Sequence, residues 1–340
     1  MRCDTYRIAG QKGQLVASQQ LFSCQIYNSY KCNCVFVGDY DKYAQRVSDF
    51  FDDLINCNAV PLVLIDCGCE DKKLQTVISR TREKEVFKDV RRKKNIRHVQ
   101  CLFEADNAIA TVARILNCPV SSYDSDFYVF GTLYIPFDTL DNYTVKSSTG
   151  NGYTKRCKIY KFEHLLNSYR GLSQSTLPLA AILLGNDYVK RGTFRNFFRY
   201  LKLRRITRKR YSNRQYCIEA TLQWLSGFYT LDRAVIGILC RSPKTVRQKI
   251  LSIIEINING YTNASAEILV PLGFLQEYAA RATTHSINRI FKFDGDVNSL
   301  MYIEETDKNG DFESSEEEEK EEENEVEILD MLKGVRIYYQ

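Results

Sequence analysis

The sequence has few of the patterns on which zinc-binding or disulfide-bonded domains depend. Only three histidines occur in 340 residues, and none of the twelve cysteines forms a C-x-x-C pair. The closest cysteines are the C-x-C pairs Cys32/Cys34 and Cys67/Cys69. Because the cysteines lie within apolar runs of a long chain, we predict buried, reduced thiols and a nuclear or cytoplasmic protein.

Long hydrophobic stretches are also absent. No apolar run approaches the ~18 residues that a membrane-spanning helix needs. Charges at Arg2, Asp4, Arg7 and Lys12 interrupt the first twenty residues, which therefore lack the apolar segment of a signal peptide. We expect a protein that is not secreted and has no membrane partner.

Acidic charge is scarce in most of the chain and concentrated at its end. Residues 301–340 contain 15 acidic and 4 basic residues, which leaves 27 acidic and 43 basic residues before them. A body this basic favours a polyanionic partner. The acidic run at residues 313–327 is of low complexity, and we expect it to be disordered.

Short apolar runs alternate with helical patterns along the first 190 residues. We predict strands at 60–65, 97–103 and 118–122, extended pieces at 15–16 and 127–135, and helices at 39–55, 72–90, 106–116, 177–184 and 217–254. Alternation of strand and helix predicts an α/β fold with a parallel sheet flanked by helices.

Acidic residues follow the ends of the predicted strands. Each has a local explanation when taken alone, either as a helix cap or in an Asx-type turn. Together they favour one pocket, because ligands of parallel sheets bind beyond the carboxyl ends of the strands. Clustered carboxylates need a cation between them, and hard oxygen ligands select Mg²⁺ or Mn²⁺. The candidate metal ligands are Asp66, Glu104, Asp106, Asp124, Asp126 and Asp187.

Two basic features accompany these acids. Lys73 and Arg80 are seven residues apart, so they share a helix face that suits a scissile phosphate or is simply solvated. Residues 190–214 contain eleven Lys or Arg, no acidic residue and several aromatics, which fit either a nucleic-acid surface or an amphipathic helix with a buried aromatic face. The candidate nucleic-acid contacts are Arg195, Arg199, Lys202, Arg204, Arg205, Arg208, Lys209 and Arg210.

These motifs resemble the flap-endonuclease/XPG superfamily of PIN-like nucleases and, within it, the asteroid family. The resemblance runs from about Gly38 to about Leu239 and is carried by G-D-Y-D, D-K-K-L, N-C-P-V, D-S-D-F and G-N-D-Y. It implies a two-metal site that binds Mg²⁺, with Mn²⁺ as a substitute, through the six acids. It also implies that Lys73 and Arg80 contact the scissile phosphate. The expected function is structure-specific cleavage of branched or overhanging DNA by a monomeric endonuclease.

The chain departs from the family pattern in three ways. It begins Met-Arg rather than Met-Gly, and Ala17 or Ser18 stands where the family has a strand-ending Asp. We therefore expect either a missing metal ligand or a truncated N-terminus. Only about twenty residues separate Arg82 from Glu104, which is short for a helical arch, and no glycine-rich helix-hairpin-helix is visible.

The expected organisation has four parts. Residues 1–37 are a poorly defined N-terminus, 38–190 a nuclease domain, 191–300 a basic helical extension and 301–340 an acidic tail. One alternative function is a degenerate nuclease fold that binds DNA or acts as a signalling adaptor, for which the family suggests growth-factor receptor signalling. Another is an RNA-directed PIN ribonuclease, which the basic helix and extension disfavour.

Overall fold

The computed structural model describes the chain in segments: residues 4–9, 13–18, 40–65, 85–101, 105–148, 152–186, 188–194, 197–198, 201, 213–262, 266–285, 291–297 and 299–300. The chain divides into two compact units. The first unit comprises Arg2–Phe162 and Tyr261–Ile290, and the second comprises Met1, Glu163–Gly260 and Phe291–Gln340. The four-part organisation expected from the sequence stays a prediction.

A five-stranded parallel sheet lies at the centre of the first unit. In spatial order its strands are β4 (Arg97–Gln100), β3 (Ala59–Ile65), β2 (Gly13–Ser18), β5 (Val120–Ser122) and β6 (Tyr134–Pro136). Every neighbouring pair is parallel, so all five strands end at one edge. The continuous buried run at the end of β3 is typical of a strand covered on both faces. The predicted parallel sheet is confirmed.

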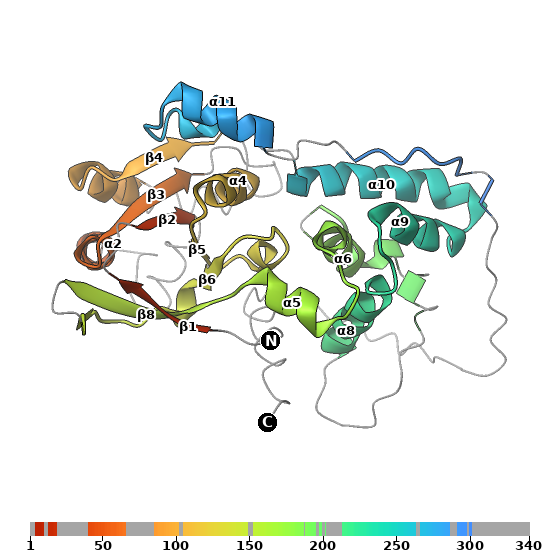
Figure 1. Ribbon diagram of the computed structural model, residues 1–340, viewed down its shortest axis with the longest axis horizontal. Coiled ribbons are helices and arrows are strands. Elements are labelled where there is room, and N and C mark those ends of the chain that lie inside the picture. The colour runs from red at the N-terminus through yellow and green to blue at the C-terminus, as the bar shows by residue number, and fades with distance from the viewer. Residues whose placement is uncertain are drawn as a thin grey trace. The chain divides into compact units, whose positions relative to one another are not determined.

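Helices cover both faces of this sheet. Figure 1 shows α2 (Tyr40–Asn56) and α4 (Asp106–Leu116) on opposite sides of the strands. Val47 and Phe51 of α2 pack with Val63 of β3 and with Phe87 of a helical segment at residues 85–93. Both helices show apolar residues at helical spacing, as the sequence predicted.

Smaller elements complete the first unit. An antiparallel sheet has the order β1-β8-β7, and α11 contacts η6. The bounds are β1 (Asp4–Ala9), β7 (Val145–Lys146), β8 (Tyr153–Ile159), η2 (Ser125–Tyr128), η3 (Phe137–Thr139), η6 (Ala266–Leu269) and α11 (Gln276–His285).

A nearly buried ion pair links β8 to α2. Lys155 Nζ lies 2.6 Å from Asp53 Oδ2, and the Lys155 side chain is only 4% exposed. We expect Asp53→Asn to lower the free energy of unfolding by about 2 kcal/mol, because the substitution leaves a buried ammonium without its counter-charge. Urea denaturation measures this loss.

The neighbouring residue Asp52 provides a matched control. Its side chain is 52% exposed and pairs with Lys94 at 2.6 Å. Exposed pairs contribute little, so Asp52→Asn should cost less than about 1 kcal/mol. Equal losses for the two variants would show that burial of Lys155 does not set the strength of its pair.

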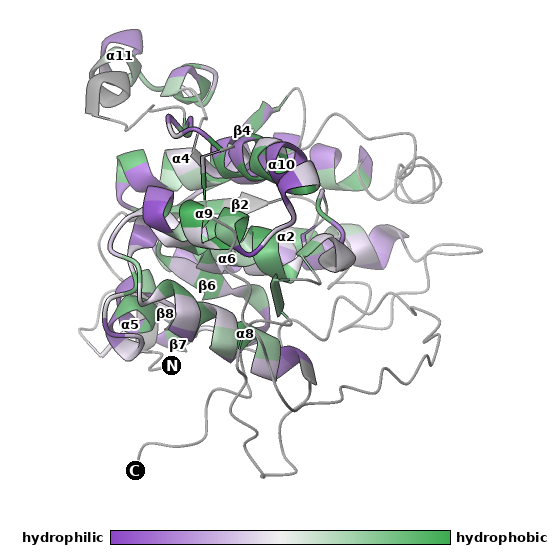
Figure 2. Ribbon diagram, turned by 90° about the vertical axis from the view of Figure 1, so that its right-hand side faces the viewer, coloured by the Kyte–Doolittle hydropathy of each residue, from purple (hydrophilic) through white to green (hydrophobic). Residues whose placement is uncertain are grey.

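The second unit is largely helical. Its elements are α5 (Phe162–Ser168, beginning at the unit boundary), η4 (Gln174–Thr176), α6 (Leu177–Leu184), η5 (Arg191–Phe194), α8 (Asn213–Leu225), α9 (Leu231–Cys240) and α10 (Lys244–Thr262), whose last two residues belong to the first unit. Six of the eight residues of α6 are buried, and Figure 2 colours α6 and α9 as mainly hydrophobic. A helix apolar on nearly all sides must be enclosed by its neighbours.

Two predicted segments differ in the structure. Of the predicted extended piece 127–135, only the end is extended, where β6 begins at Tyr134. The part before it is not, because Asp124 caps the 3₁₀ helix η2 and Gly131 adopts a positive φ of 70°. The predicted helix over residues 217–254 is divided into α8, α9 and α10. The breaks lie after Leu225, where Thr230 caps α9, and at Pro243, which precedes α10.

The predicted burial of the cysteines is confirmed for five of the six that the structure describes. All six are free, and only Cys217 is not fully buried. Burial raises the pKa of the Cys118 thiol to about 12, so this thiol stays protonated at neutral pH. Within the described residues, none of the helices is both long and apolar enough to cross a bilayer.

Candidate functional site

The carboxyl edge of the parallel sheet is the place where the predicted acids follow the strands. Ile65 and Gln100 form the last described pair between β3 and β4, and Asp66 is the next residue after Ile65. At the neighbouring strand, β5 ends at Ser122, two residues before Asp124. The central strand β2 ends at Ser18, which carries no carboxylate. The topology therefore directs several acid-bearing connections to one edge.

A tight turn fixes the D-S-D motif after β5. Ser122 Oγ accepts a hydrogen bond from the Asp124 N–H at 3.1 Å. The Asp124 carboxylate in turn accepts from the Asp126 N–H at 2.9 Å and caps η2. This is the Asx-type turn that the sequence offered as a local explanation. Both carboxylates are half-buried, so the turn holds them beside the sheet rather than out in solvent.

Buried aromatic side chains pack next to this turn and stabilise it. Phe127 is fully buried, and its ring centroid lies 5.9 Å from that of Tyr134 on β6. The Tyr134 hydroxyl donates to the Ser122 carbonyl at 2.9 Å. Burial, followed by the nearby Tyr128 and Asp124, raises the pKa of Tyr134 well above its ordinary value. Tyr134 therefore remains a neutral hydrogen-bond donor next to the negative charge of Asp124.

Tyr261 holds the second carboxylate of the motif. Its hydroxyl donates to Asp126 Oδ2 at 3.3 Å, and its ring lies 5.0 Å from the ring of Phe130. Tyr261 comes from the last turn of α10, 135 residues along the chain from Asp126. No pattern in the sequence indicates this contact. A hydrogen-bond donor in this position orients the carboxylate, as the supporting residues of metal ligands do.

Asp106 reaches the same edge from a helix. It is the first residue of α4, whose N-cap is Ala105, and it is half-buried. Since α4 connects the parallel strands β4 and β5, its N-terminus lies at their carboxyl edge, and α4 contacts η2. The helix dipole favours an ionised carboxylate here, so the local explanation by helix electrostatics also fits.

Three of the six candidate ligands are thus described, and all three belong to the carboxyl edge. Asp106, Asp124 and Asp126 are half-buried oxygen donors, which suits Mg²⁺ or Mn²⁺. Within the described part of the chain, however, no group of three or more acidic, His or Cys side chains is close enough to hold a metal ion. The others, Asp66, Glu104 and Asp187, lie outside the described residues, as do Lys73 and Arg80. The metal site stays a prediction.

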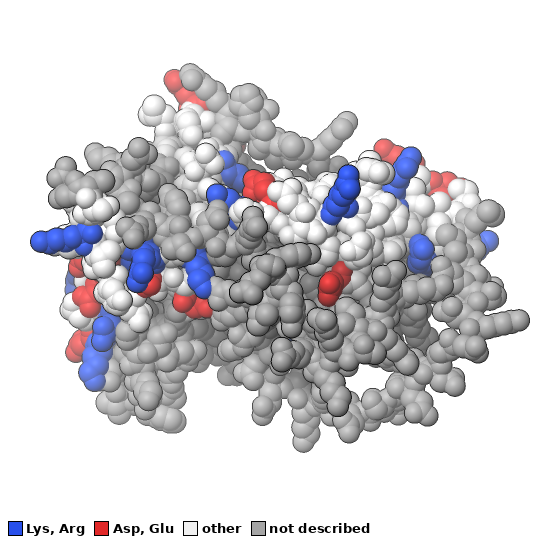
Figure 3. All heavy atoms as spheres, turned by 60° about the horizontal axis from the view of Figure 1, so that its bottom comes forward, with Lys and Arg blue, Asp and Glu red and all other residues white. Residues whose placement is uncertain are grey.

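The predicted nucleic-acid contacts also lie outside the described residues. This holds for Arg195, Arg199, Lys202, Arg204, Arg205, Arg208, Lys209 and Arg210. On the face drawn in Figure 3, the Lys and Arg side chains of the described residues are interspersed with Asp and Glu. The expected basic surface therefore depends on residues outside this set.

Curated relatives match much of the chain. It is 32% identical to Protein asteroid of Drosophila melanogaster over 323 residues, which cover 73% of this chain and 37% of the fly protein. It is 30% identical to the Single-strand DNA endonuclease ASTE1 of Homo sapiens over 256 residues, covering 68% of this chain and 38% of the human protein. The corresponding Danio rerio protein is 34% identical, covering 63% of this chain. The chain therefore spans well under half the length of these relatives.

Solved structures are similar at lower identity. Human GEN1 in complex with Holliday junction DNA is 15% identical, with a TM-score of 0.43, and the match covers 88% of this chain and 66% of that chain. The catalytic core of Rad2 with a DNA substrate is 15% identical, with a TM-score of 0.45, and coverages of 84% and 96%. No family model matches the sequence. Because both TM-scores lie below 0.5, the assignment depends on the sequence relatives: the chain belongs to the asteroid family.

Proposed function

We propose that this chain is a metal-dependent, structure-specific DNA endonuclease whose activity is weakened by the absence of a carboxylate at the end of β2. The observation that carries the proposal is the parallel register of the sheet, which directs the acid-bearing ends of β3, β4 and β5 to one edge. Two relatives named single-strand DNA endonucleases support this substrate class.

In this proposal the acids at the carboxyl edge bind the metal, and neighbouring groups hold them in place. Asp106, Asp124 and Asp126 would hold Mg²⁺ or Mn²⁺ together with Asp66, Glu104 and Asp187. A bound metal would supply Lewis acidity at the phosphate. The Asx turn and Tyr261 keep the carboxylates of the D-S-D motif in place before substrate arrives, which lowers the reorganisation needed during the reaction. Lys73 and Arg80 would stabilise the negative charge on the scissile phosphate.

Cleavage of a DNA panel tests the proposal. We expect the protein to cut branched or overhanging DNA in Mg²⁺ or Mn²⁺, to leave blunt duplex intact, and to lose all activity in EDTA. DNA binding without cleavage in either metal would instead favour the degenerate nuclease fold. That alternative is supported by the end of the central strand, where Ala17 and Ser18 supply no carboxylate. Preferential cleavage of RNA would favour the PIN ribonuclease.

Tyr261 offers a test of carboxylate positioning. We expect Tyr261→Phe to lower kcat/KM about fivefold, because one hydrogen bond to a charged group typically contributes on the order of 1 kcal/mol or more. The half-maximal Mg²⁺ concentration should rise at the same time, since Asp126 loses a group that orients it. A metal titration of the cleavage rate measures both effects.

Tyr229 provides the matched control for this substitution. Its side chain is 83% exposed in the second unit, so Tyr229→Phe should change neither the rate nor the Mg²⁺ response. An unaltered Mg²⁺ response in Tyr261→Phe would show that its hydroxyl has no part in the metal site.

A further inference from the structure

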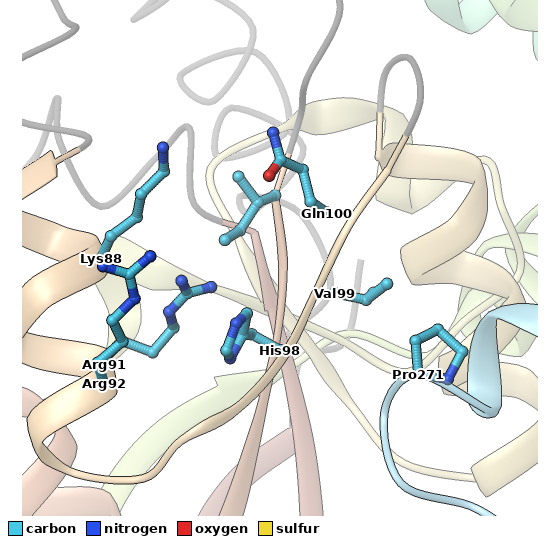
Figure 4. Close-up of a pocket in the computed structure, with 8 residues that line it drawn as sticks. Lys88, Arg91, Arg92, His98, Val99, Gln100 and Pro271 are labelled. Carbon is cyan, nitrogen blue, oxygen red and sulfur yellow. The ribbon is translucent and has the colours of Figure 1, made fainter.

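A basic pocket lies beside the acidic edge of the sheet. Its volume is about 270 Å³, and it is lined by the helical segment 85–93, by the carboxyl ends of β3 and β4, and by Pro271 (Figure 4). Lys88, Arg91, Arg92 and His98 contribute to the lining, and none of the described lining residues is acidic. A cavity with this lining is suited to an anion rather than to an apolar ligand.

Arg91 is the residue of this pocket that most clearly indicates a bound anion. Its side chain is only 2% exposed, and its Nε and Nη1 atoms have no hydrogen-bond partner among the described residues. Burial, with a smaller effect from Arg92, lowers the pKa of Arg91 to about 10, which still leaves the guanidinium charged at neutral pH. Buried charges in folded proteins are normally paired, so an unpaired buried guanidinium indicates a place for a counter-ion.

The remaining polar groups surround the same space. Lys88, Arg91 and Arg92 have the i, i+3, i+4 spacing that places side chains on one helix face. His98 and Gln100 are two residues apart on β4 and share one face of that strand. Figure 4 shows one of the two arginine side chains extending from the helix towards the imidazole of His98.

Nearby carboxylates do not neutralise Arg91. Glu85 lies 2.6 Å from Lys88, and Asp89 lies 3.8 Å from Arg92. Both pairs are at least partly exposed to solvent, and ion pairs of this kind are weak and exchange readily with other partners. They leave the two Arg91 nitrogen atoms without a partner.

We propose that this pocket binds a phosphate group. A guanidinium presents a planar fork of N–H donors that fits two phosphate oxygens at once, and the neighbouring lysine and arginine add positive charge. The volume is below the range of roughly 300–1,000 Å³ of pockets for larger ligands, so it suits a phosphate with little more than its ester substituent. Ile65 and Gln100 both line the pocket and form the last described pair of their ladder, beside the edge that carries the candidate metal ligands.

The phosphate has two possible sources. If the proposed endonuclease function is correct, it belongs to a DNA strand that crosses the acidic edge. Otherwise, it is a free phosphate or a small phosphomonoester. A DNA phosphate as the ligand rests on the proposed endonuclease function. The phosphate site itself does not depend on that function.

Binding of inorganic phosphate to the metal-free protein tests the site without any cleavage assay. Calorimetric titration at constant ionic strength should show saturable binding that Arg91→Met weakens at least tenfold. Arg92→Gln alters an exposed residue and should weaken it about threefold. Arg233→Met removes an exposed arginine of α9 in the second unit and should have no effect. Equal binding by wild type, Arg91→Met and Arg92→Gln would overturn the proposal.

Single-stranded DNA then distinguishes the sources. Weaker binding of a 5′-phosphorylated strand alone by Arg91→Met assigns a terminal phosphate, and equal weakening with a 5′-hydroxyl strand assigns a backbone phosphate. An effect on inorganic phosphate but on neither strand assigns a free anion. Arg91-dependent phosphate binding in a protein that cuts no DNA would leave the pocket established and reject the endonuclease proposal. DNA cleavage by a protein whose phosphate binding does not depend on Arg91 would reject the pocket and leave the endonuclease proposal standing.

Discussion

Asp126→Asn is expected to lower the rate of metal-dependent DNA cleavage about 1,000-fold. An amide has the same shape as the carboxylate and can still accept a hydrogen bond from Tyr261, but it lacks the charge that binds a hard cation. A loss of this size corresponds to about 4 kcal/mol of transition-state stabilisation, which is reasonable for a direct ligand of a catalytic metal. Single-turnover cleavage of an overhanging DNA at saturating Mg²⁺ measures it.

The fold should survive this substitution. Asp126 is half-buried, and the backbone bonds that its N–H and carbonyl make within η2 do not depend on its side-chain charge. We expect the unfolding midpoint of Asp126→Asn to stay close to that of wild type. Asp49→Asn makes the same change at an exposed position of α2 and should retain full activity. Wild-type cleavage by Asp126→Asn would remove this residue from the metal site.

The fold could be predicted from the sequence largely because its apolar patterns are strong. Helices at 106–116 and 177–184 have the predicted bounds, since both combine a helical apolar pattern with clear ends. The continuous apolar run of β3 identified a strand buried on both faces. Local hydrogen bonding limited the prediction at 127–128, where the Asp124 side chain caps a 3₁₀ helix in a segment that looked extended.

The site was less accessible to sequence reasoning because its contacts are long-range. Acids at strand ends indicated where Asp106, Asp124 and Asp126 would lie, but nothing in the sequence connects Tyr261 to Asp126. The pocket presents the same difficulty. Lys88, Arg91 and Arg92 look alike in a charged helix, and only the fold makes Arg91 the buried member. Burial of one charge among several depends on tertiary packing, which periodicity alone does not reveal.

Ser18→Asp is expected to raise the cleavage rate about 100-fold above that of the chain as it stands. β2 is the central strand of the parallel sheet, and Ser18 is its last residue, paired with Leu64 of β3. The family resemblance implies an Asp at the end of this strand. A carboxylate there would add an oxygen donor beside the candidate ligands that follow β3 and β5, and its absence is the physical reason to expect weak activity. Steady-state cleavage at several Mg²⁺ concentrations should also show a lower half-maximal Mg²⁺ concentration.

Ala17→Asp is the matched control, because successive residues of a strand point to opposite faces of the sheet. Ala17 pairs with Val63 and Ser121 in the ladder. By this alternation a carboxylate at position 17 lies on the opposite face from one at position 18, and it should not increase cleavage. If Ser18→Asp folds normally, binds DNA and still cuts nothing in Mg²⁺ or Mn²⁺, the missing ligand is not what limits activity, and the chain acts as a nuclease fold without catalysis.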